Sequence, residues 1–234
     1  EESETVVRFK RDACPRCNKI QGNYYESIVQ IRPTGKRFSD DEKAEILKRS
    51  VSYVETASKE SRDAFMAKAV EAHGGYDLYL STIALGKGLA RNLVSIYGAE
   101  YKESSSLQGR KDGVDLYRVT YLVRLPPYRV RDIVEIGGKL YLVQSTGPHS
   151  AKLRNLKHGD NLTMTNVDLR NVKVVGTKED VKEAVVLGEG RRELQLMHPV
   201  TFETMDVRKP QGFERKGDTI KVFLHEGELY IIGN

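Results

Sequence analysis

Residues 117–128 read YRVTYLVRLPPY, and this stretch divides the chain into two parts of different character. Tyr117–Leu125 alternates apolar and polar side chains, which is the pattern of a strand with one buried face. Pro126 and Pro127 then exclude a helix and weaken any strand. We therefore place a domain boundary at residue 125.

The segment before this boundary mixes strand and helix patterns. Tyr24–Arg32 alternates as a strand, and with an earlier strand over Thr5–Lys10 it would form a hairpin that carries the sequence CPRC near its tip. Ser39, followed by Glu42, has the spacing of a capping box at a helix start. The other expected elements are a helical stretch with Phe65, Ala69 and Val70 that ends at His73-Gly74-Gly75, a strand over Tyr76–Thr82, a helix from Leu85 to Ile96, and a strand over Tyr101–Leu107. The prediction for residues 1–125 is one α+β domain with a mostly antiparallel sheet and helices on one side.

Beyond the prolines the pattern is one of short alternating segments between Gly, Asp and Asn turns, with no good helix. Two small β-barrels are predicted, over residues 126–178 and 179–234. The expected strands include Val134–Ile136, Leu140–Gln144, Leu162–Thr165, Val172–Val175, Glu193–Met197, Thr201–Val207, Thr219–Leu224 and Leu229–Ile232.

The composition is that of a mildly basic globular protein. Lysine and arginine number 38 against 33 acidic residues, and the 39% hydrophobic content is enough for packed cores. A net charge of +5 fits a phosphate-bearing partner. No apolar run approaches the roughly 20 residues that span a bilayer, so no membrane partner is expected. The first residues are acidic, unlike a signal peptide, and lack an initiator Met, so we expect a cytoplasmic protein whose upstream sequence is missing here.

The two cysteines, Cys14 and Cys17, form a single CxxC. This spacing presents two thiolates to one metal ion, and zinc takes four such ligands. We favour half of a zinc site whose partner ligands lie upstream. A redox CxxC is expected at a helix N-terminus, and we place this one between strands. An incidental pair of buried thiols is the remaining alternative.

Two groups of basic residues are candidates for RNA binding. Gln144–Lys157 is a polar Gly/Pro/His loop between strands, although composition alone favours a solvated hairpin loop. Arginines on strand faces and near the cysteines, interleaved with Tyr24, Tyr25, Tyr121 and Tyr128, suggest a second basic surface, and an ordinary charged surface explains them equally well. The candidates are Arg16, Arg118, Arg124, Arg129, Arg131, His149, Lys152, Arg154 and Lys157.

Sequence motifs for catalysis are missing. There is no Walker loop, no GxGxxG, no GxSxG and no HExxH. The chain is therefore expected to be a factor without enzymatic activity and without a small-molecule substrate.

Five blocks occur in an order that is more specific than any one of them: CPRC at 14–17, YYESIVQIR at 24–32, HGGYDLYLST at 73–82, GLARNLVSIYGAEYKESSSLQG at 88–109 and YRVTYLVRLP at 117–126. In this order they resemble the ribosomal large-subunit export adaptor family (nonsense-mediated decay protein three), in an archaeal form. That family binds zinc through repeated CxxC pairs, which implies that Cys14 and Cys17 are the last pair.

The second half is similar to translation factor five A, an SH3-like barrel followed by an OB-like barrel. YLVQSTGPHSAKLRNL at 141–156 resembles its modified-lysine loop, and LQLMHPVTFETMDVRKP at 194–210 resembles its second barrel. Where that factor carries its modified lysine, between Gly and His, this chain has Pro148. No amine is present there to modify.

Together the resemblances imply binding to the intersubunit face of the large ribosomal subunit, near the exit-tRNA site and the L1 stalk, in contact with rRNA and ribosomal proteins. They imply a role in ribosome biogenesis or quality control, with other assembly factors as further partners. The chain lacks the export-signal tail of eukaryotic members, so nuclear export is not expected. A translation factor acting on elongating ribosomes and a general RNA-binding protein are the alternatives; an RNA-modifying or hydrolytic enzyme has the least support.

Overall fold

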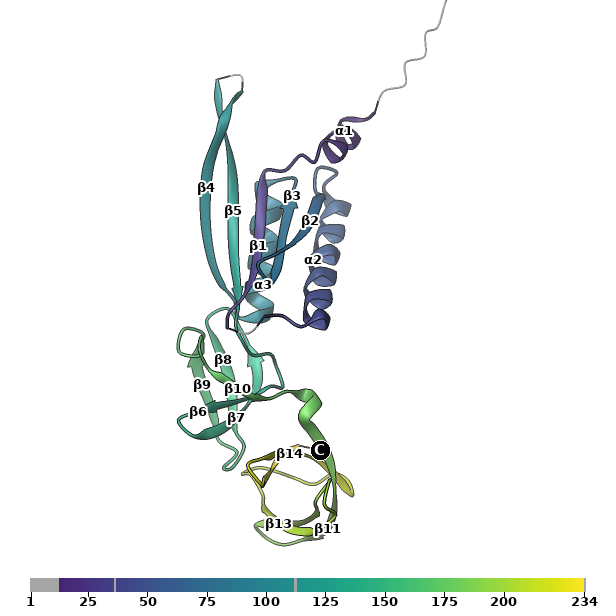
Figure 1. Ribbon diagram of the computed structural model, residues 1–234, viewed down its shortest axis with the longest axis vertical. Helices are drawn as coiled ribbons and strands as arrows, with labels where there is room; N and C mark the ends of the chain where they lie inside the picture. Colours follow the sequence, from purple (N-terminus) through teal and green to yellow (C-terminus); the bar gives the residue numbers. More distant parts are fainter. Residues whose placement is uncertain (1–12, 36, 112, 234) are drawn as a thin grey trace, which may run out of the picture. The chain divides into compact units, whose positions relative to one another are not determined.

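The computed structural model describes residues 13–35, 37–111 and 113–233 (Figure 1). Its first part contains three helices and five strands. In chain order these are α1 (Pro15–Gln21), β1 (Ser27–Pro33), α2 (Asp40–Glu60), β2 (Met66–Ala72), β3 (Gly75–Leu80), α3 (Ile83–Tyr97), β4 (Glu100–Lys111) and β5 (Val114–Leu125). The strands form one sheet in the order β2-β3-β1-β5-β4. The predicted strand over Thr5–Lys10 lies outside the described residues.

The sheet is mixed, and one of its faces is packed against helices. Ser27, Val29 and Ile31 of β1 are completely buried, which confirms the predicted alternation along this strand. β2 and β3 are antiparallel. β1 and β5 run parallel, because Val119 N–H donates to Glu26 O and Thr34 N–H donates to Leu125 O. The α+β class predicted for this region is therefore confirmed.

The predicted second helical stretch is wrong, because residues 66–72 form strand β2. His73 (φ 51°) and Gly74 (φ 74°) both take left-handed backbone conformations. Two such residues make the tight turn whose twist suits a β-hairpin, and Ala72 accordingly pairs with Gly75. The glycines thus close a hairpin and do not cap a helix. Gly98, in contrast, does end a helix: it has φ 66°, and its N–H donates to Val94 O at the end of α3.

Helix α2 begins with the predicted capping box. Ser39 Oγ accepts from Glu42 N at 3.2 Å, and Ser39 N donates to Glu42 Oε2 at 2.9 Å. These two bonds satisfy backbone donors that a helix start otherwise leaves without partners.

Ser39→Ala is expected to lower the free energy of unfolding by about 1 kcal/mol, because it removes one of these acceptors. Urea-induced unfolding followed by circular dichroism measures the change. Ser39→Asp keeps an acceptor at the same place and serves as the control. Equal stability of the alanine and aspartate variants would contradict the assignment.

Two antiparallel five-stranded sheets follow. The first contains β6 (Ile133–Ile136), β7 (Lys139–Thr146), β8 (Ser150–Asn155), β9 (Asn161–Thr165) and β10 (Lys173–Gly176). Its order, β10-β6-β7-β8-β9, is the strand order of an SH3-like barrel. Its interior is a cluster of buried apolar side chains that includes Val134, Val143 and Leu153.

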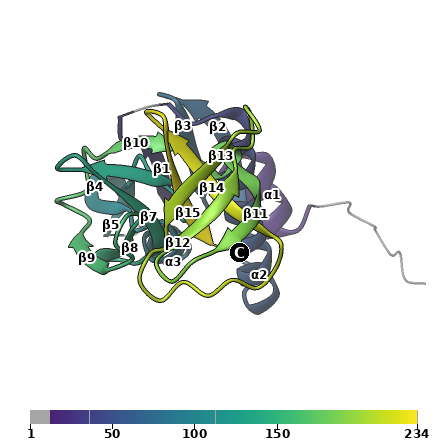
Figure 2. The same cartoon turned by 90° about the horizontal axis from the view of Figure 1, so that it is seen from below.

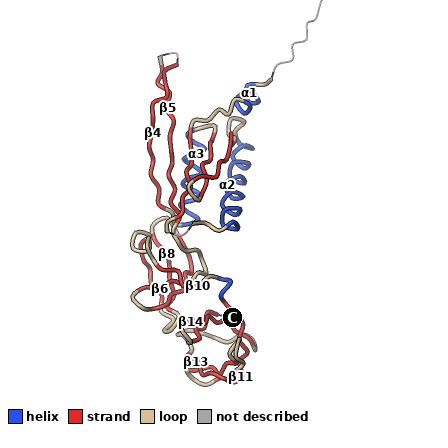
Figure 3. Tube along the Cα trace, viewed as in Figure 1, coloured by secondary structure: helices blue, strands red, loops and turns tan. Residues whose placement is uncertain are grey.

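The second sheet contains β11 (Val181–Glu189), β12 (Glu193–Met197), β13 (Thr204–Arg208), β14 (Thr219–His225) and β15 (Glu228–Gly233). Its order is β13-β12-β11-β14-β15, with β13 also near β15, as in the five-stranded OB-fold. Figure 2 shows these strands from below, and their buried apolar core includes Leu194, Ile220 and Val222. A short 3₁₀ segment, Lys178–Asp180, precedes β11 (Figure 3). Both predicted barrel architectures are therefore confirmed.

The packing of the chain divides it into two compact units. The first contains the described residues up to Gln30 together with 39–89 and 103–121, and the second contains residues 31–38, 90–102 and those from 122 onward. Within the second unit, a buried cluster joins the two barrel sheets: Ile133, Leu140 and Leu156 come from the first and Phe223 from the second. None of the helices in the described ranges combines the length and apolarity that crossing a bilayer requires.

Candidate nucleic-acid interface

The predicted basic loop is shorter than expected, because most of it is strand. β7 continues to Thr146 and β8 begins at Ser150, which leaves a tip of three residues, Gly147-Pro148-His149. Ala151 and Leu153 are fully buried. Alternation along β8 therefore turns Lys152 and Arg154 outward. The run SAKLRN already has this alternation, but the adjoining Gly, Pro and His suggested a loop.

The outward side chains of β8 lie among polar neighbours. Lys152 pairs with Ser145 on β7 and with Thr163 on β9. Lys152 is exposed, whereas Arg154 is half-buried. Arg154 lies opposite Leu142, whose side chain packs against the cluster that joins the two barrels. Lys152 is thus the freer of the two cations for a phosphate contact.

The hairpin tip is held in place from several sides. Gly147 O accepts from Asn166 Nδ2 at 2.9 Å, and Asn166 N donates to His149 O at 3.0 Å. Thr146 Oγ1 donates to Ile96 O at the end of α3, at 3.0 Å. Position 98 requires glycine for two reasons. Its backbone is left-handed, with φ 66°, and a Cβ there would come within 2.9 Å of Gly147 O. These bonds fix the turn, and the His149 side chain on it is exposed.

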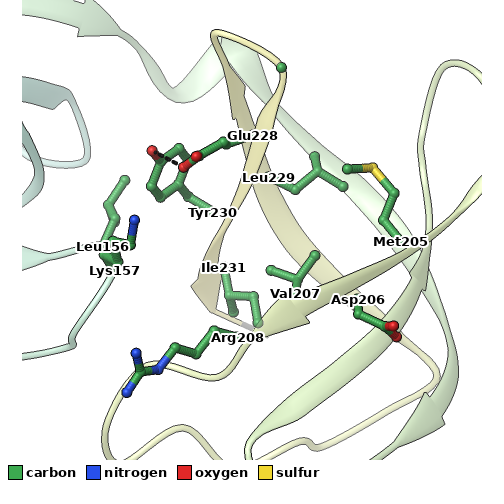
Figure 4. Close-up of a pocket in the computed structure, with 11 residues that line it drawn as sticks. Leu156, Lys157, Met205, Asp206, Val207, Arg208, Glu228, Leu229, Tyr230 and Ile231 are labelled. Carbon is green, nitrogen blue, oxygen red and sulfur yellow. Dashed lines mark hydrogen bonds between the residues drawn. The ribbon is translucent and has the colours of Figure 1, made fainter.

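Lys157 borders a cavity of about 260 Å³ within the second unit (Figure 4). Arg208, Asp206 and Glu228 also line it. Tyr230 Oη donates to Glu228 Oε2 at 2.8 Å, and burial together with this carboxylate raises the pKa of Tyr230 to about 12. The cavity thus mixes two cations with two acids. This lining offers no arrangement of nucleophile and base that would support catalysis.

Among the predicted arginines, Arg129 has a structural explanation. Its guanidinium donates to Pro126 O at 2.7 Å and to Tyr128 O at 2.9 Å. It also lies over the rings of Phe38 and Tyr97, 5.7 and 5.6 Å from their centroids. These interactions fix the chain just after the two prolines.

The other arginines are placed differently. Arg124 and Arg131 are exposed, and Arg131 has a left-handed backbone with φ 78°. Arg16 is half-buried in α1 and borders a hollow of about 220 Å³. Arg118 lies over the Tyr25 ring, 4.1 Å from its centroid, and is half-buried.

Two of the four tyrosines that we placed on the predicted basic surface are not on the surface. Tyr121 and Tyr128 are 0% and 1% exposed, so neither ring can stack on a nucleotide. Tyr121 belongs to the helix-facing side of β5, where alternation from Val119 places it. Burial raises the pKa of Tyr128 to about 12. Sequence reasoning also missed Tyr79, whose ring packs edge-on against Tyr25.

The CPRC sequence lies at a helix start, which corrects the predicted turn; the strand predicted before it lies outside the described residues. A helix start is also where a redox CxxC is expected, so this placement removes the argument made against the redox alternative. Cys14 is the N-cap of α1, because its Sγ accepts from Cys17 N at 3.3 Å. The proline at N1 suits a helix start, which explains the local fold. Both thiols are exposed, so the alternative of buried thiols is wrong as well.

The two thiols lie close together at the helix start, as two ligands of one metal ion would have to. Their Sγ atoms are 3.1 Å apart, and the hydrogen bond between them lowers the pKa of Cys14 and raises that of Cys17. Zinc requires two further ligands. Within the described residues, no group of three or more His, Cys, Asp or Glu side chains could hold a metal ion.

Comparison with known proteins finds a family match in the first part of the chain. Residues 24–125 match the family model for the second domain of NMD3, which confirms the resemblance of the ordered sequence blocks over this range. A solved structure titled eukaryotic translation initiation factor 5A, from Methanococcus jannaschii, is 16% identical. That similarity covers 45% of this chain and 89% of the other, with a TM-score of 0.30. No curated protein matches the sequence.

Proposed function

From the match of residues 24–125 to the NMD3 second-domain model, we propose that this chain binds the large ribosomal subunit as a biogenesis or quality-control adaptor. Its binding site is the intersubunit face, in the tRNA-site and L1-stalk region. The match to the NMD3 domain is the observation that carries this proposal. The chain acts by occupying the site and carries out no reaction.

The second unit supplies side chains suited to such occupancy. Lys152 is exposed on β8 and His149 on the fixed hairpin tip. Lys and Arg side chains on rigid strands bind phosphates at little cost in ordering. Pro148 at the tip has no side-chain amine that could be modified. The hairpin therefore fills space in the binding site and takes part in no reaction.

Replacing Lys152 and Arg154 together by alanine is expected to weaken binding to free large subunits. Removing one phosphate-binding cation lowers the slope of log affinity against log salt by about 1, so the slope should fall by about 2. Co-sedimentation with purified large subunits across a salt series measures both quantities.

The matched control is Lys48→Ala with Lys59→Ala. Both lysines are exposed on α2, and their removal changes the net charge by the same amount. If the two double variants have equal slopes, the β8 cations do not contact rRNA. If the unmodified protein fails to sediment with large subunits, the proposed function is wrong.

We also propose that Cys14 and Cys17 are two ligands of a zinc ion whose other ligands lie outside the described residues. Zinc would act structurally, by fixing the start of α1. Cys14→Ser with Cys17→Ser should reduce the zinc bound by the natural protein by one ion per chain, as measured by mass spectrometry of the metal content. An unchanged zinc content would refute the half-site.

A further inference from the structure

One row of cationic and aromatic side chains crosses the five-stranded sheet of the first part of the chain. Lys68 Nζ, on β2, lies 4.3 Å from the centroid of the Tyr79 ring on β3. The Tyr79 and Tyr25 rings pack edge to face, with centroids 4.8 Å apart and planes at 84°. Arg118 on β5 lies 4.1 Å from the Tyr25 centroid and donates to Gln108 Oε1 on β4 at 3.1 Å. The row follows the order of the strands.

The two main helices lie together on the other face of this sheet. Leu78 and Leu80 are fully buried, so Tyr79 between them faces away from the helices. Lys68 pairs with Tyr79 and faces the same way. On β5, Val119 and Tyr121 are buried, which turns Arg118 to the open face. α2 and α3 are neighbours, because a Cβ on Gly88 would meet Tyr53 Oη at 2.3 Å.

Charge is distributed unequally between the two faces. The helix-side glutamates are paired with helix lysines: Lys43 with Glu71 at 2.5 Å and Lys87 with Glu103 at 3.6 Å. The open face carries Lys68 and Arg118, and alternation along β4 from Gln108 adds the exposed Arg110. Asp77, two residues before Tyr79, is the acidic side chain on the same face of β3. The open face therefore has an excess of positive charge, which suits a polyanion.

The side chains of the open face can bind nucleobases as well as phosphates. Stacking on Tyr25 and bonding to Gln108 hold the planar Arg118 guanidinium in one orientation. A nucleobase can stack on such a plane or on an aromatic ring. Three strand spacings of about 4.8 Å separate β2 from β5. RNA-binding domains that use a sheet face stack two or three bases over a comparable width.

We propose that the open face of this sheet binds a short single-stranded RNA segment, with bases stacked on Arg118 and the Tyr25–Tyr79 pair and a phosphate near Lys68. The choice of RNA as the partner rests on the proposed function. The new elements are that this RNA is single-stranded and that these residues bind it. Duplex RNA offers no free base faces, and an acidic protein offers no bases.

The test measures binding of the intact chain to a fluorescently labelled 12-nucleotide single-stranded RNA by anisotropy. Tyr79→Ala should raise the Kd about 5- to 150-fold, the factor expected when one base loses its stacking partner. Arg118→Lys keeps the charge but loses the planar group, so its Kd should also rise. Tyr117→Ala, at an exposed position on the opposite face of β5, and Arg62→Ala, at an exposed position in the turn before β2, are the matched controls and should leave the Kd unchanged.

Several outcomes would overturn the proposal. One is an equal Kd for the unmodified protein, Tyr79→Ala and Arg118→Lys. The others are tighter binding of duplex RNA than of single-stranded RNA of the same sequence, and tighter binding of polyglutamate than of RNA. Thermal melting checks that each variant is folded, and Arg118→Lys provides the test if Tyr79→Ala does not fold. No ribosomal subunit enters this assay, so its failure is distinguishable from failure of subunit binding.

Discussion

Phe223→Ala is expected to lower the free energy of unfolding by about 3–5 kcal/mol, the usual cost of emptying a buried aromatic site. Phe223 is 3% exposed and lies in the cluster with Ile133, Leu140 and Leu156 that joins the two barrel sheets. Its ring rests on Gly176 of β10, where an added Cβ would come within 2.4 Å. The alanine variant should therefore destabilise both barrels together.

Urea-induced unfolding followed by tyrosine fluorescence measures this destabilisation, since the chain contains no tryptophan. Phe202→Ala is the matched control, because Phe202 is 71% exposed in the turn before β13. A surface substitution of this kind should change stability by less than about 0.5 kcal/mol. Equal destabilisation by the two variants would show that the cluster does not join the barrels.

Gly86→Val is expected to cost about 3 kcal/mol, at the upper end of the range for overfilling a packed core. A Cβ at Gly86 of α3 would meet Ser27 Oγ at 2.3 Å and Tyr121 Cε2 at 3.0 Å. Ser27 is fully buried, and its hydroxyl donates to Thr82 O at 2.8 Å. The close approach of α3 to β1 therefore depends on small residues at both positions.

A double-mutant comparison tests this contact. Gly86→Ala alone should destabilise the protein, and adding Ser27→Gly should recover part of the stability because it removes the clashing atoms. The same urea unfolding assay measures both. Strictly additive effects would contradict a direct contact between the two positions.

The parts of the fold that sequence predicts well are those where local signals and burial agree. The capping box at Ser39 and the alternation of Ser27, Val29 and Ile31 are both found in the structure. On α2, Leu47, Val51 and Val54 recur at helical spacing, and of these three Val54 is buried. Its buried companions are Ile46 and Ser50, so the buried stripe lies one position away from Leu47 and Val51. Apolar spacing alone does not decide which side of a helix meets the sheet when small polar residues such as Ser50 can also be buried.

The errors come from segments where two patterns compete. Phe65, Ala69 and Val70 have helical spacing, but the turn at His73-Gly74 and pairing with β3 make the segment a strand. The alternation of β8 is obscured by the adjoining Gly, Pro and His. For the candidate site, Tyr79 was missed because its partners are distant in sequence: Tyr25 and Lys68 reach it only through the strand order β2-β3-β1.

Binding to the large subunit is tested most directly by sedimentation of the intact chain, at near-physiological salt, with free large subunits, free small subunits and joined ribosomes. Binding at the intersubunit face predicts that the chain sediments with free large subunits and stays unbound with the other two, since the small subunit covers that face in joined ribosomes. Equal binding to small subunits or to joined ribosomes, or no binding to large subunits, would contradict the central claim.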